Sequence, residues 1–406
     1  MSDLEGLTNA MRQVDPSAIE TELDNDWRAN NAKALASGGQ AAARSSVLTL
    51  VVYSNNDEQA RRALEAVHTL TGQHPSRSVV IAPLYDAASD KALEAYIQTR
   101  AEGLTGAISY GEEILLRASP NAEQHLAGAI LPLILSGLPA FLWWQGEPLW
   151  RAPLFEATID GFDRVLVDTS EMGPSRQTLI ALEDVIARKR ASCAFSDFGF
   201  ARLNPWRELV ARFFDAPEML TYLHGLDRLA IEYAAGEMAH ETNASQAYLF
   251  AGWLASRLGW TALGGGLAQT PGGAHEHTLR DAVGRTISLE INPRYGLPLK
   301  SWADQERDGM DGLSAGPGAL MSVYLRGQRN GDVATFSVAR ESQDLRNAST
   351  RCQAPGVSMP SQTIHMPSLG EATALGSELE RSGHDTVFED SIALAAQLLG
   401  APTRRS

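Results

Sequence analysis

The chain has 406 residues, a length typical of two or three domains, and 44% of them are apolar, which is enough to build a sizeable core. Lys and Arg number 34 against 49 Asp and Glu, so the net charge is −15. This balance argues against binding to nucleic acid or to an anionic membrane, because phosphates would be repelled. Cys193 and Cys352 could form one disulfide, but two cysteines exclude a disulfide framework and a four-thiolate zinc site.

The N-terminal sequence has neither the basic flank nor the apolar core of a secretory signal, so we expect a cytoplasmic protein. Most of the negative charge lies near the two ends. Residues 1–30 carry seven acids and two Arg, and residues 368–390 carry six acids and one Arg, a net charge of −5 in each case. We expect both segments to present charged helical faces to solvent, where they could steer a basic partner.

Residues 1–36 predict a helical extension in two pieces. Asp15 supplies an N-cap ahead of a first-turn proline, and Ile19, Leu23 and Trp27 recur on one helical face. Residues 29–44 contain few large apolar side chains and predict a loop.

A β-α-β unit follows. Residues 46–53 form a continuously apolar strand, typical of a parallel sheet that is covered on both faces. Asn56 caps a helix that ends near Gly72, and residues 77–83 form the next strand. A parallel pair with a right-handed crossover is therefore expected.

Residues 106–118 predict a strand, a turn near Gly111 and a second strand. From His125 to Gly146 there is no Asp, Glu, Lys or Arg, and the stretch from Leu126 to Trp144 would just span a bilayer. Two prolines and a glycine divide this stretch, which favours a buried helix followed by a strand at residues 140–144 over a membrane segment.

A strand at residues 164–168 and a helix at residues 175–189 continue the alternation. Residues 1–172 therefore predict an α/β domain with a mixed, partly parallel sheet, which includes the helical extension 1–36.

Residues 173–406 predict an α+β domain. Asn330-Gly331 is a hairpin signal between two alternating runs, and residues 245–258 are apolar nearly all round, as in a central buried helix. The other expected elements are a helix from Asn204, strands at 226–234, 286–291, 319–325 and 332–339, and closing helices at 371–381 and 385–399.

The sequence lacks the common catalytic and cofactor motifs. No Gly-x-Gly-x-x-Gly, Gly-Lys pair, Gly-x-Ser-x-Gly, Cys-x-x-Cys or His-Glu-x-x-His occurs. His275 and His277 could project to one side as paired metal ligands, but the neighbouring glycines favour an exposed, solvated loop. We predict no metal and no cofactor.

Two groups of residues are candidates for a partner interface. His74 and Arg77 lie in a compact polar turn at the amino end of a strand, the wrong edge for a ligand of a parallel sheet. Trp143 and Trp144 are consecutive strand residues, so the sheet core explains only one of them and the other meets a second layer or a partner. Trp150 follows close behind.

Seven segments, taken in order, resemble one family, the OpcA proteins that assemble glucose-6-phosphate dehydrogenase. They are residues 44–53, 74–81, 112–116, 125–144, 164–170, 203–215 and 248–260.

The resemblance implies a non-catalytic protein that binds glucose-6-phosphate dehydrogenase, favours its active oligomer and acts as an allosteric activator in the oxidative pentose phosphate pathway. It implies no catalytic residues. A different class remains open, an enzyme or sensor for sugar phosphates, which requires a polar pocket at the carboxyl ends of the strands near Ser54-Asn55 and near Asp168 to Ser170.

Overall fold

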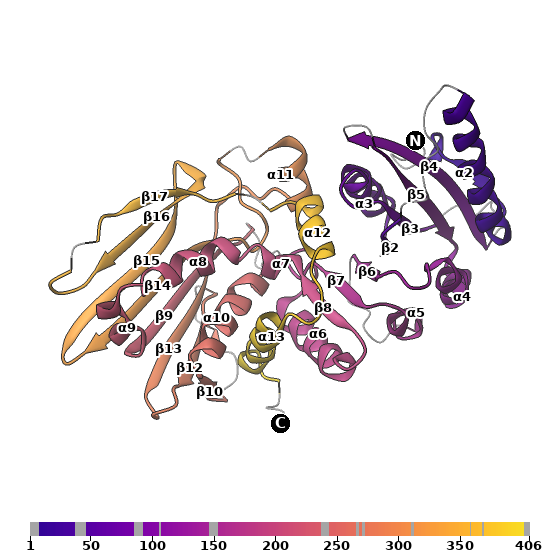
Figure 1. The fold of residues 1–406 in the computed structure, drawn as a ribbon. Coiled ribbons are helices and arrows are strands. Elements are labelled where there is room, and N and C mark those ends of the chain that lie inside the picture. Colours follow the sequence, from indigo (N-terminus) through magenta and orange to yellow (C-terminus); the bar gives the residue numbers. More distant parts are fainter. Residues whose placement is uncertain are drawn as a thin grey trace. The chain divides into compact units, whose positions relative to one another are not determined.

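The computed structural model describes residues 8–36, 46–84, 92–104, 107–145, 153–236, 243–264, 268–269, 273–309, 312–357, 359–367 and 369–401. The chain divides into two compact units (Figure 1). Unit 1 comprises Met1–Val167, Lys189–Ser196 and Ala372–His384, and unit 2 comprises Asp168–Arg188, Asp197–Glu371 and Asp385–Ser406.

Unit 1 is built on an eight-stranded sheet in the order β1-β4-β5-β3-β2-β6-β7-β8. The central strands β5, β3, β2, β6 and β7 are parallel, whereas β4 pairs antiparallel with both β5 and β1. The strands are β1 Arg12–Val14, β2 Leu48–Tyr53, β3 Ser76–Pro83, β4 Leu93–Leu104, β5 Ala107–Ala118, β6 Ala140–Trp144, β7 Arg164–Val167 and β8 Ala194–Asp197.

The helices of unit 1 are α2 Ile19–Ala36, α3 Asp57–Leu70, α4 Leu126–Ile130, α5 Pro153–Thr158 and α12 Glu371–Leu379, with short 3-10 turns η1 Pro16–Ala18, η2 Pro120–His125, η3 Leu131–Leu133 and η4 Ile159–Gly161. Helix α3 begins where expected, because the Asn56 side chain accepts a hydrogen bond from the backbone of Gln59. Its buried face consists of apolar residues at helical spacing: Ala60, Ala63, Leu64, Ala66, Val67 and Leu70.

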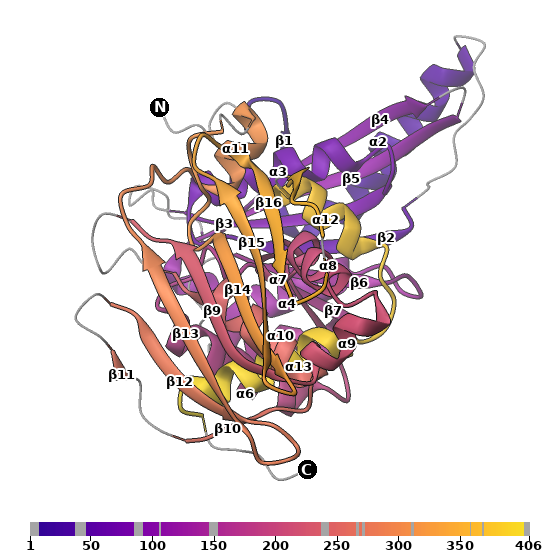
Figure 2. The same ribbon diagram turned by 90° about the vertical axis from the view of Figure 1, so that its left-hand side faces the viewer.

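Unit 2 contains a nine-stranded sheet in the order β10-β12-β13-β9-β14-β15-β16-β17, with β11 paired to β12. Figure 2 shows its long strands side by side. Every pairing is antiparallel except that of β9 with β13. The strands are β9 Leu226–Ala234, β10 Thr261–Ala262, β11 Ala268–Gln269, β12 His275–Arg280, β13 Thr286–Arg294, β14 Leu320–Arg329, β15 Asp332–Glu341, β16 Asp344–Gln353 and β17 Gln362–His365.

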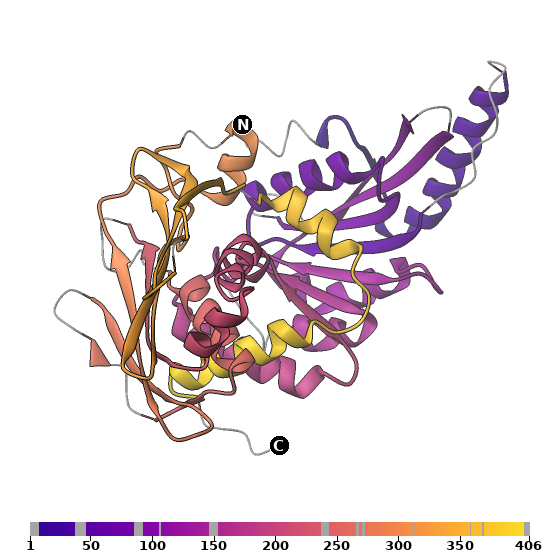
Figure 3. The ribbon, with the colours of Figure 1, turned by 60° about the vertical axis from the view of Figure 1, so that its left-hand side comes forward.

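The helices of unit 2 are α6 Ser175–Lys189, α7 Phe198–Ala201, α8 Asn204–Arg212, α9 Pro217–Leu223, α10 Ser245–Arg257, α11 Trp302–Asp308 and α13 Thr386–Leu398. Helices α8, α9 and α10 pack on the sheet, and Figure 3 shows them on one of its faces. Helix α10 also packs against α13. A Cβ built on Gly252 would lie 2.1 Å from the carbonyl oxygen of Ser391, so this close approach of two helices requires glycine.

The predicted fold class is confirmed: the N-terminal sheet is mixed and mostly parallel, and the C-terminal sheet is mostly antiparallel. The boundary expected at residues 172–173 stays a prediction. The stretch from Leu126 to Trp144 forms short helical turns followed by strand β6, as preferred. Within the described part of the chain, no helix has both the length and the apolar character needed to cross a bilayer.

Several local predictions were wrong. Arg12–Val14 form strand β1, where a helix was expected, and α2 continues through Ala36, into the stretch expected to be a loop. Strand β4 was missed entirely. Gly111 lies inside β5 and not in a turn, because the strand passes so close to Thr71 that a Cβ would stand 2.8 Å from the Thr71 methyl carbon.

Candidate functional site

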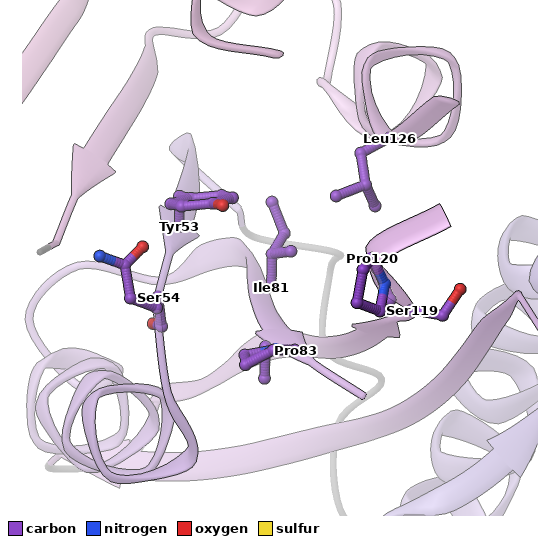
Figure 4. A pocket seen from close by; sticks show the side chains of 10 residues that line it. Tyr53, Ser54, Ile81, Pro83, Ser119, Pro120 and Leu126 are labelled. Carbon is purple, nitrogen blue, oxygen red and sulfur yellow. The ribbon is translucent and has the colours of Figure 1, made fainter. Parts of the chain in front are cut away.

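A pocket of about 250 Å³ lies at the carboxyl ends of β2, β3 and β5 in unit 1 (Figure 4). This is the edge of a parallel sheet at which ligands bind, and the stretch Ser54-Asn55 lies there as the sequence indicated for a ligand site. The lining residues are Tyr53, Ser54, Asn55, Ile81, Ala82, Pro83, Ala118, Ser119, Pro120 and Leu126.

The apolar wall of this pocket is held from behind by aromatic stacking. The Tyr53 ring lies parallel to the Trp144 indole, with centroids 4.1 Å apart and an interplanar angle of 9°. Trp144 in turn meets the ring of Phe155 edge-on at 5.0 Å. Since Trp144 and Phe155 are almost fully buried, the position of the Tyr53 ring is fixed by the core of unit 1.

The polar wall is formed where β2 leads into α3. The Ser54 hydroxyl donates to Oε1 of Gln145 at 2.8 Å, and the backbone of Asn55 donates to Oε1 of Gln59 at 2.8 Å. Gln145 is 7% exposed, and its Nε2 has no hydrogen-bond partner among the described residues. Ser54, which lines the pocket, is thus bonded to a buried amide that is not itself part of the lining.

The strand order β5-β3-β2-β6-β7-β8 is that of doubly wound sheets that bind dinucleotides, so the fit of such a cofactor can be tested. A dinucleotide places its pyrophosphate on the amides of the first helix, through a glycine-rich turn. Here the turn contains no glycine, and Asn56 already accepts the Gln59 amide. Asp57 and Glu58 add two carboxylates in the first turn of α3.

At about 6 Å, each carboxylate would disfavour a phosphate charge by on the order of 1–3 kcal/mol. In addition, Ile81 to Pro83 at the end of β3 provide no carboxylate for ribose hydroxyls. The residues at this edge therefore do not fit a dinucleotide.

Arg77, predicted as an interface residue, is 1% exposed and makes ion pairs inside unit 1. Its Nε donates to Glu112 at 2.7 Å, its two terminal nitrogens donate to Glu20, and Nη1 also donates to the carbonyl of Leu133 at 3.2 Å. Glu20 belongs to α2, so Arg77 fastens the N-terminal helix to the sheet. His74 lies nearby, with its side chain 14% exposed and Nε2 3.7 Å from Glu380.

The two acidic terminal segments thus each place a carboxylate beside the His74–Arg77 turn. The expectation that these segments are simply solvated was wrong for three acids near the C-terminus. Glu371, Glu378 and Glu389 are 5%, 2% and 6% exposed, respectively. The C-terminal segment is also bound by Arg164, whose Nη2 donates to the carbonyl of Gly383.

Trp143 and Trp144 are each 1% exposed. Both indoles therefore pack inside the chain. Of the two possibilities that the sequence left open for the second Trp, a second layer or a partner, the structure shows a second layer. Trp150 lies outside the described residues. The interface role of these three residues stays a prediction.

The other edge considered for a ligand, Asp168 to Ser170, is occupied by internal hydrogen bonds of unit 2. Both oxygens of Asp168 accept from Nη1 of Arg202 at 2.8 Å. Asp197 accepts from the backbone and hydroxyl of Thr169 and from the backbone of Gly199. Burial, with the charge of Asp168, raises the pKa of Asp197 to about 7.

The expectation that His275 and His277 lie in a loop was wrong. Both lie in strand β12, on the face turned toward α10. The Tyr248 hydroxyl contacts Nδ1 of His275 at 2.7 Å and Nε2 of His277 at 3.1 Å. Burial lowers the pKa of His277 to about 4, with His275 adding to the effect. Among the described residues, no group of three or more His, Cys, Asp or Glu could hold a metal ion.

Both cysteines are free thiols. Burial raises the pKa of Cys193 to about 12 and also raises the pKa of Cys352. Neither thiol is activated as a nucleophile, which agrees with the interpretation of both as ordinary thiols.

The pocket residues beyond Ser54 and Asn55 were missed from the sequence, because residues 106–118 were divided at Gly111. The sequence did contain a signal for these pocket residues, the apolar run Ile114 to Leu116 followed by Ser119-Pro120. It marks a buried strand ending in a polar turn, as at the end of β2.

Comparison with solved structures finds dehydrogenases of low similarity. Examples are levoglucosan dehydrogenase with NADH (10% identity, TM-score 0.43, covering 86% of this chain and 94% of that one) and an NAD-binding oxidoreductase from Klebsiella pneumoniae (10%, 0.42, 88% and 91%). Likeness at this level carries no argument about activity.

Among curated proteins, the chain is similar to OpcA proteins of the OxPP cycle. The identity is 27% over 341 residues for Synechocystis sp. (82% of this chain, 65% of the relative) and 26% over 291 residues for Nostoc punctiforme (71% and 57%). For Synechococcus elongatus it is 25% over 413 residues (98% and 83%). The chain thus spans less than two thirds of the length of the first two relatives.

Two family models match in order along the chain. One describes the N-terminal domain of a glucose-6-phosphate dehydrogenase subunit and matches residues 67–184, and the other describes the C-terminal domain of that subunit and matches residues 193–392. These descriptions are of a subunit and not of a catalytic enzyme. Because the two matches together cover most of the sequence, the chain belongs to the OpcA family of glucose-6-phosphate dehydrogenase subunit proteins.

Proposed function

We propose that this protein is a non-catalytic assembly factor and allosteric activator that binds glucose-6-phosphate dehydrogenase in the cytoplasm and favours its active oligomer. The observation that carries the proposal is the ordered match of both subunit domain models over residues 67–184 and 193–392. The proposal requires neither a cofactor nor nucleic acid.

The energy that such a function needs is small. An assembly factor shifts an equilibrium only by the difference between its affinities for the two states of the enzyme. A difference of about 1.4 kcal/mol shifts that equilibrium tenfold, which a few well-packed interface residues supply.

The residues named from the sequence enter this proposal in two ways. Arg77, Trp143 and Trp144 are 1% exposed, so they would shape a docking surface from within. His74 would lie at the rim of that surface, with Glu380, whose side chain is 72% exposed, beside it, and Trp150 keeps the interface role that the sequence predicts for it. A carboxylate at that rim would favour a basic patch on the enzyme.

The experiment mixes the purified chain with the cognate dehydrogenase and measures oligomer mass by light scattering, together with the dependence of rate on glucose-6-phosphate. We expect a larger mass and a changed rate or affinity; if all three are unaltered, the proposal fails. Glu380→Lys should slow association, most strongly at low salt. Glu208→Lys on α8, a matched charge reversal at a side chain 67% exposed, should not.

A second candidate is a sensor of sugar phosphates, which is favoured by one observation, the pocket beside Ser54 and Asn55. Asp57 and Glu58, which follow Asn55 in the first turn of α3, oppose it, because a phosphate would have to displace them from Arg117 and Arg61. Calorimetric titration of the chain alone with glucose-6-phosphate tests this candidate, and saturable binding would favour it over the first.

A further inference from the structure

The pocket at the ends of β2, β3 and β5 is suited in size to one small molecule. Its volume of about 250 Å³ lies just below the range of about 300–1,000 Å³ that holds drug-sized ligands. A single ring system with one attached sugar is of this order, whereas a dinucleotide is not. All of its lining residues are described, and all belong to unit 1.

The walls of the pocket favour a flat ligand. Figure 4 shows Tyr53, Ile81 and Leu126 around one hollow, with Pro83 and Pro120 nearby. The Tyr53 ring cannot rotate freely because Trp144 stacks on it at 4.1 Å. A rigid aromatic wall with aliphatic side chains beside it gains most from a planar, aromatic occupant.

The polar groups sit at the edges of the hollow, where they suit hydroxyl and amide groups of a ligand. Ser54 and Asn55 follow β2, and Ser119 follows β5. Behind Ser54, the 7% exposed Gln145 has an Nε2 group with no partner in the described part of the chain. A ligand hydroxyl can bond the Ser54 and Ser119 hydroxyls of the lining, and Gln145 orients the Ser54 hydroxyl by accepting from it.

The charges around the pocket select against anions. Asp57 and Glu58 occupy the first turn of α3, next to Asn55. Both carboxylates are already paired: Nη2 of Arg117 lies 3.7 Å from Asp57, and the Arg61 guanidinium donates to both oxygens of Glu58 at 3.0 and 2.5 Å. A phosphate at this end would have to compete with the two carboxylates for these cations, whereas an uncharged sugar would not.

We propose that this pocket binds an uncharged nucleoside, with its base against Tyr53, Ile81 and Leu126 and its sugar hydroxyls toward Ser54 and Asn55. The pocket excludes the phosphorylated forms of the same nucleoside. This site is separate from docking on the dehydrogenase and is tested on the chain alone.

The test is calorimetric titration of the full chain with adenosine, and with AMP as the charged comparator. We expect adenosine to bind with a Kd below about 1 mM and AMP at least about tenfold more weakly. Ser119→Trp, which fills the pocket, should weaken adenosine binding about tenfold or more without changing the thermal unfolding midpoint. Ser192→Trp, at an exposed position of a turn, is the matched control and should bind as the wild type does.

A second pair of variants tests the charge argument without altering the shape of the pocket. Asp57→Asn should narrow the preference for adenosine over AMP to less than about threefold, because it removes one carboxylate and frees Arg117. Glu65→Gln carries the same charge change on the same helix, at an exposed position paired with Arg61, and should leave the preference unchanged. Adenosine binding weaker than 1 mM, equal affinity for AMP, or unaltered binding to Ser119→Trp would each overturn the proposal.

Discussion

Replacing Asp197 with asparagine should make unit 2 more stable, by an amount that grows with pH. Asp197 is 3% exposed. Its Oδ1 accepts from the backbone of Thr169 and of Gly199 at 2.9 and 3.0 Å, and its Oδ2 pairs with the Thr169 hydroxyl at 2.6 Å. An asparagine keeps these contacts, because its oxygen accepts both amides and its NH2 donates to the hydroxyl.

The direction of the pH dependence follows from the pKa of Asp197 in the folded and in the unfolded chain. Burial, with the charge of Asp168, raises the pKa of Asp197 from 3.8 to about 7 in the folded protein, against the lowering effect of the three hydrogen bonds. Between these values the unfolded chain has released its proton and the folded chain has not, so the stability of the wild type falls as pH rises. A shift of about three units corresponds to about 4 kcal/mol at pH 7 and above.

The assay is urea unfolding of both proteins from pH 5.5 to 8, above the sequence pI of about 5.1. The stability difference, variant minus wild type, should rise by about 1.4 kcal/mol per pH unit, about 2 kcal/mol in all, and level off near pH 7. Asp184→Asn, which breaks an exposed pair with Arg188 on α6, should give a small difference with little dependence on pH.

A difference that does not vary with pH would refute this account, because it would mean that the Asp197 carboxylate is already ionised at pH 5.5. A difference that becomes less favourable to the variant as pH rises would refute it more strongly. That result would show that the ionised group is stabilised in the fold.

Three further changes test other contacts. Arg77→Met should destabilise unit 1 by about 3–5 kcal/mol in chemical denaturation, because it leaves Glu112 buried without its cation; loss of no more than about 1 kcal/mol would contradict the pairing. Gly252→Ala should lower the unfolding midpoint of unit 2, with a cost of about 1–3 kcal/mol, since its Cβ would overlap a backbone carbonyl of α13; an unchanged midpoint would show that the helices separate freely. The imidazole of His277, followed by NMR, should titrate near pH 4; because the unfolded form takes up a proton below pH 6.5, stability is lost as pH falls from there toward 4, and His277→Gln should reduce that loss.

The sequence predicted those parts of the fold that depend on local pattern. The β2-α3-β3 unit was predicted because a continuous apolar run, a capping Asn56 and a helical apolar face agree with one another. The hairpin at Asn330-Gly331 was predicted because Asn and Gly are the residues that most readily adopt the positive φ of a tight hairpin turn. In the structure their φ angles are 49° and 91°.

The errors arose where a distant neighbour decides the role of a residue. Glycine is typical of turns, but Gly111 lies inside β5, where the missing side chain lets the strand pass close to Thr71. No local pattern in the sequence shows this contact. Arg77 has the chemistry of a docking residue, and its interface role stays a prediction; no local pattern showed that Glu20 and Glu112, far away in sequence, pair with it inside unit 1. His275 and His277 follow a glycine-rich stretch but alternate with Glu276 in a strand over Tyr248. The pocket needed the parallel alignment of β3 with β5, which joins residues from both strands.

The division of the chain between its two units has a consequence for synthesis. Unit 1 takes its last piece, Ala372–His384, from beyond the whole central part of unit 2. During translation, residues 197–371 are therefore synthesised after the strands of unit 1 and before the segment whose Gly383 carbonyl accepts from Arg164. At about 5–20 residues per second this delay is roughly 10–35 s, in which the nascent unit 1 is incomplete and relies on its remaining contacts or on a chaperone.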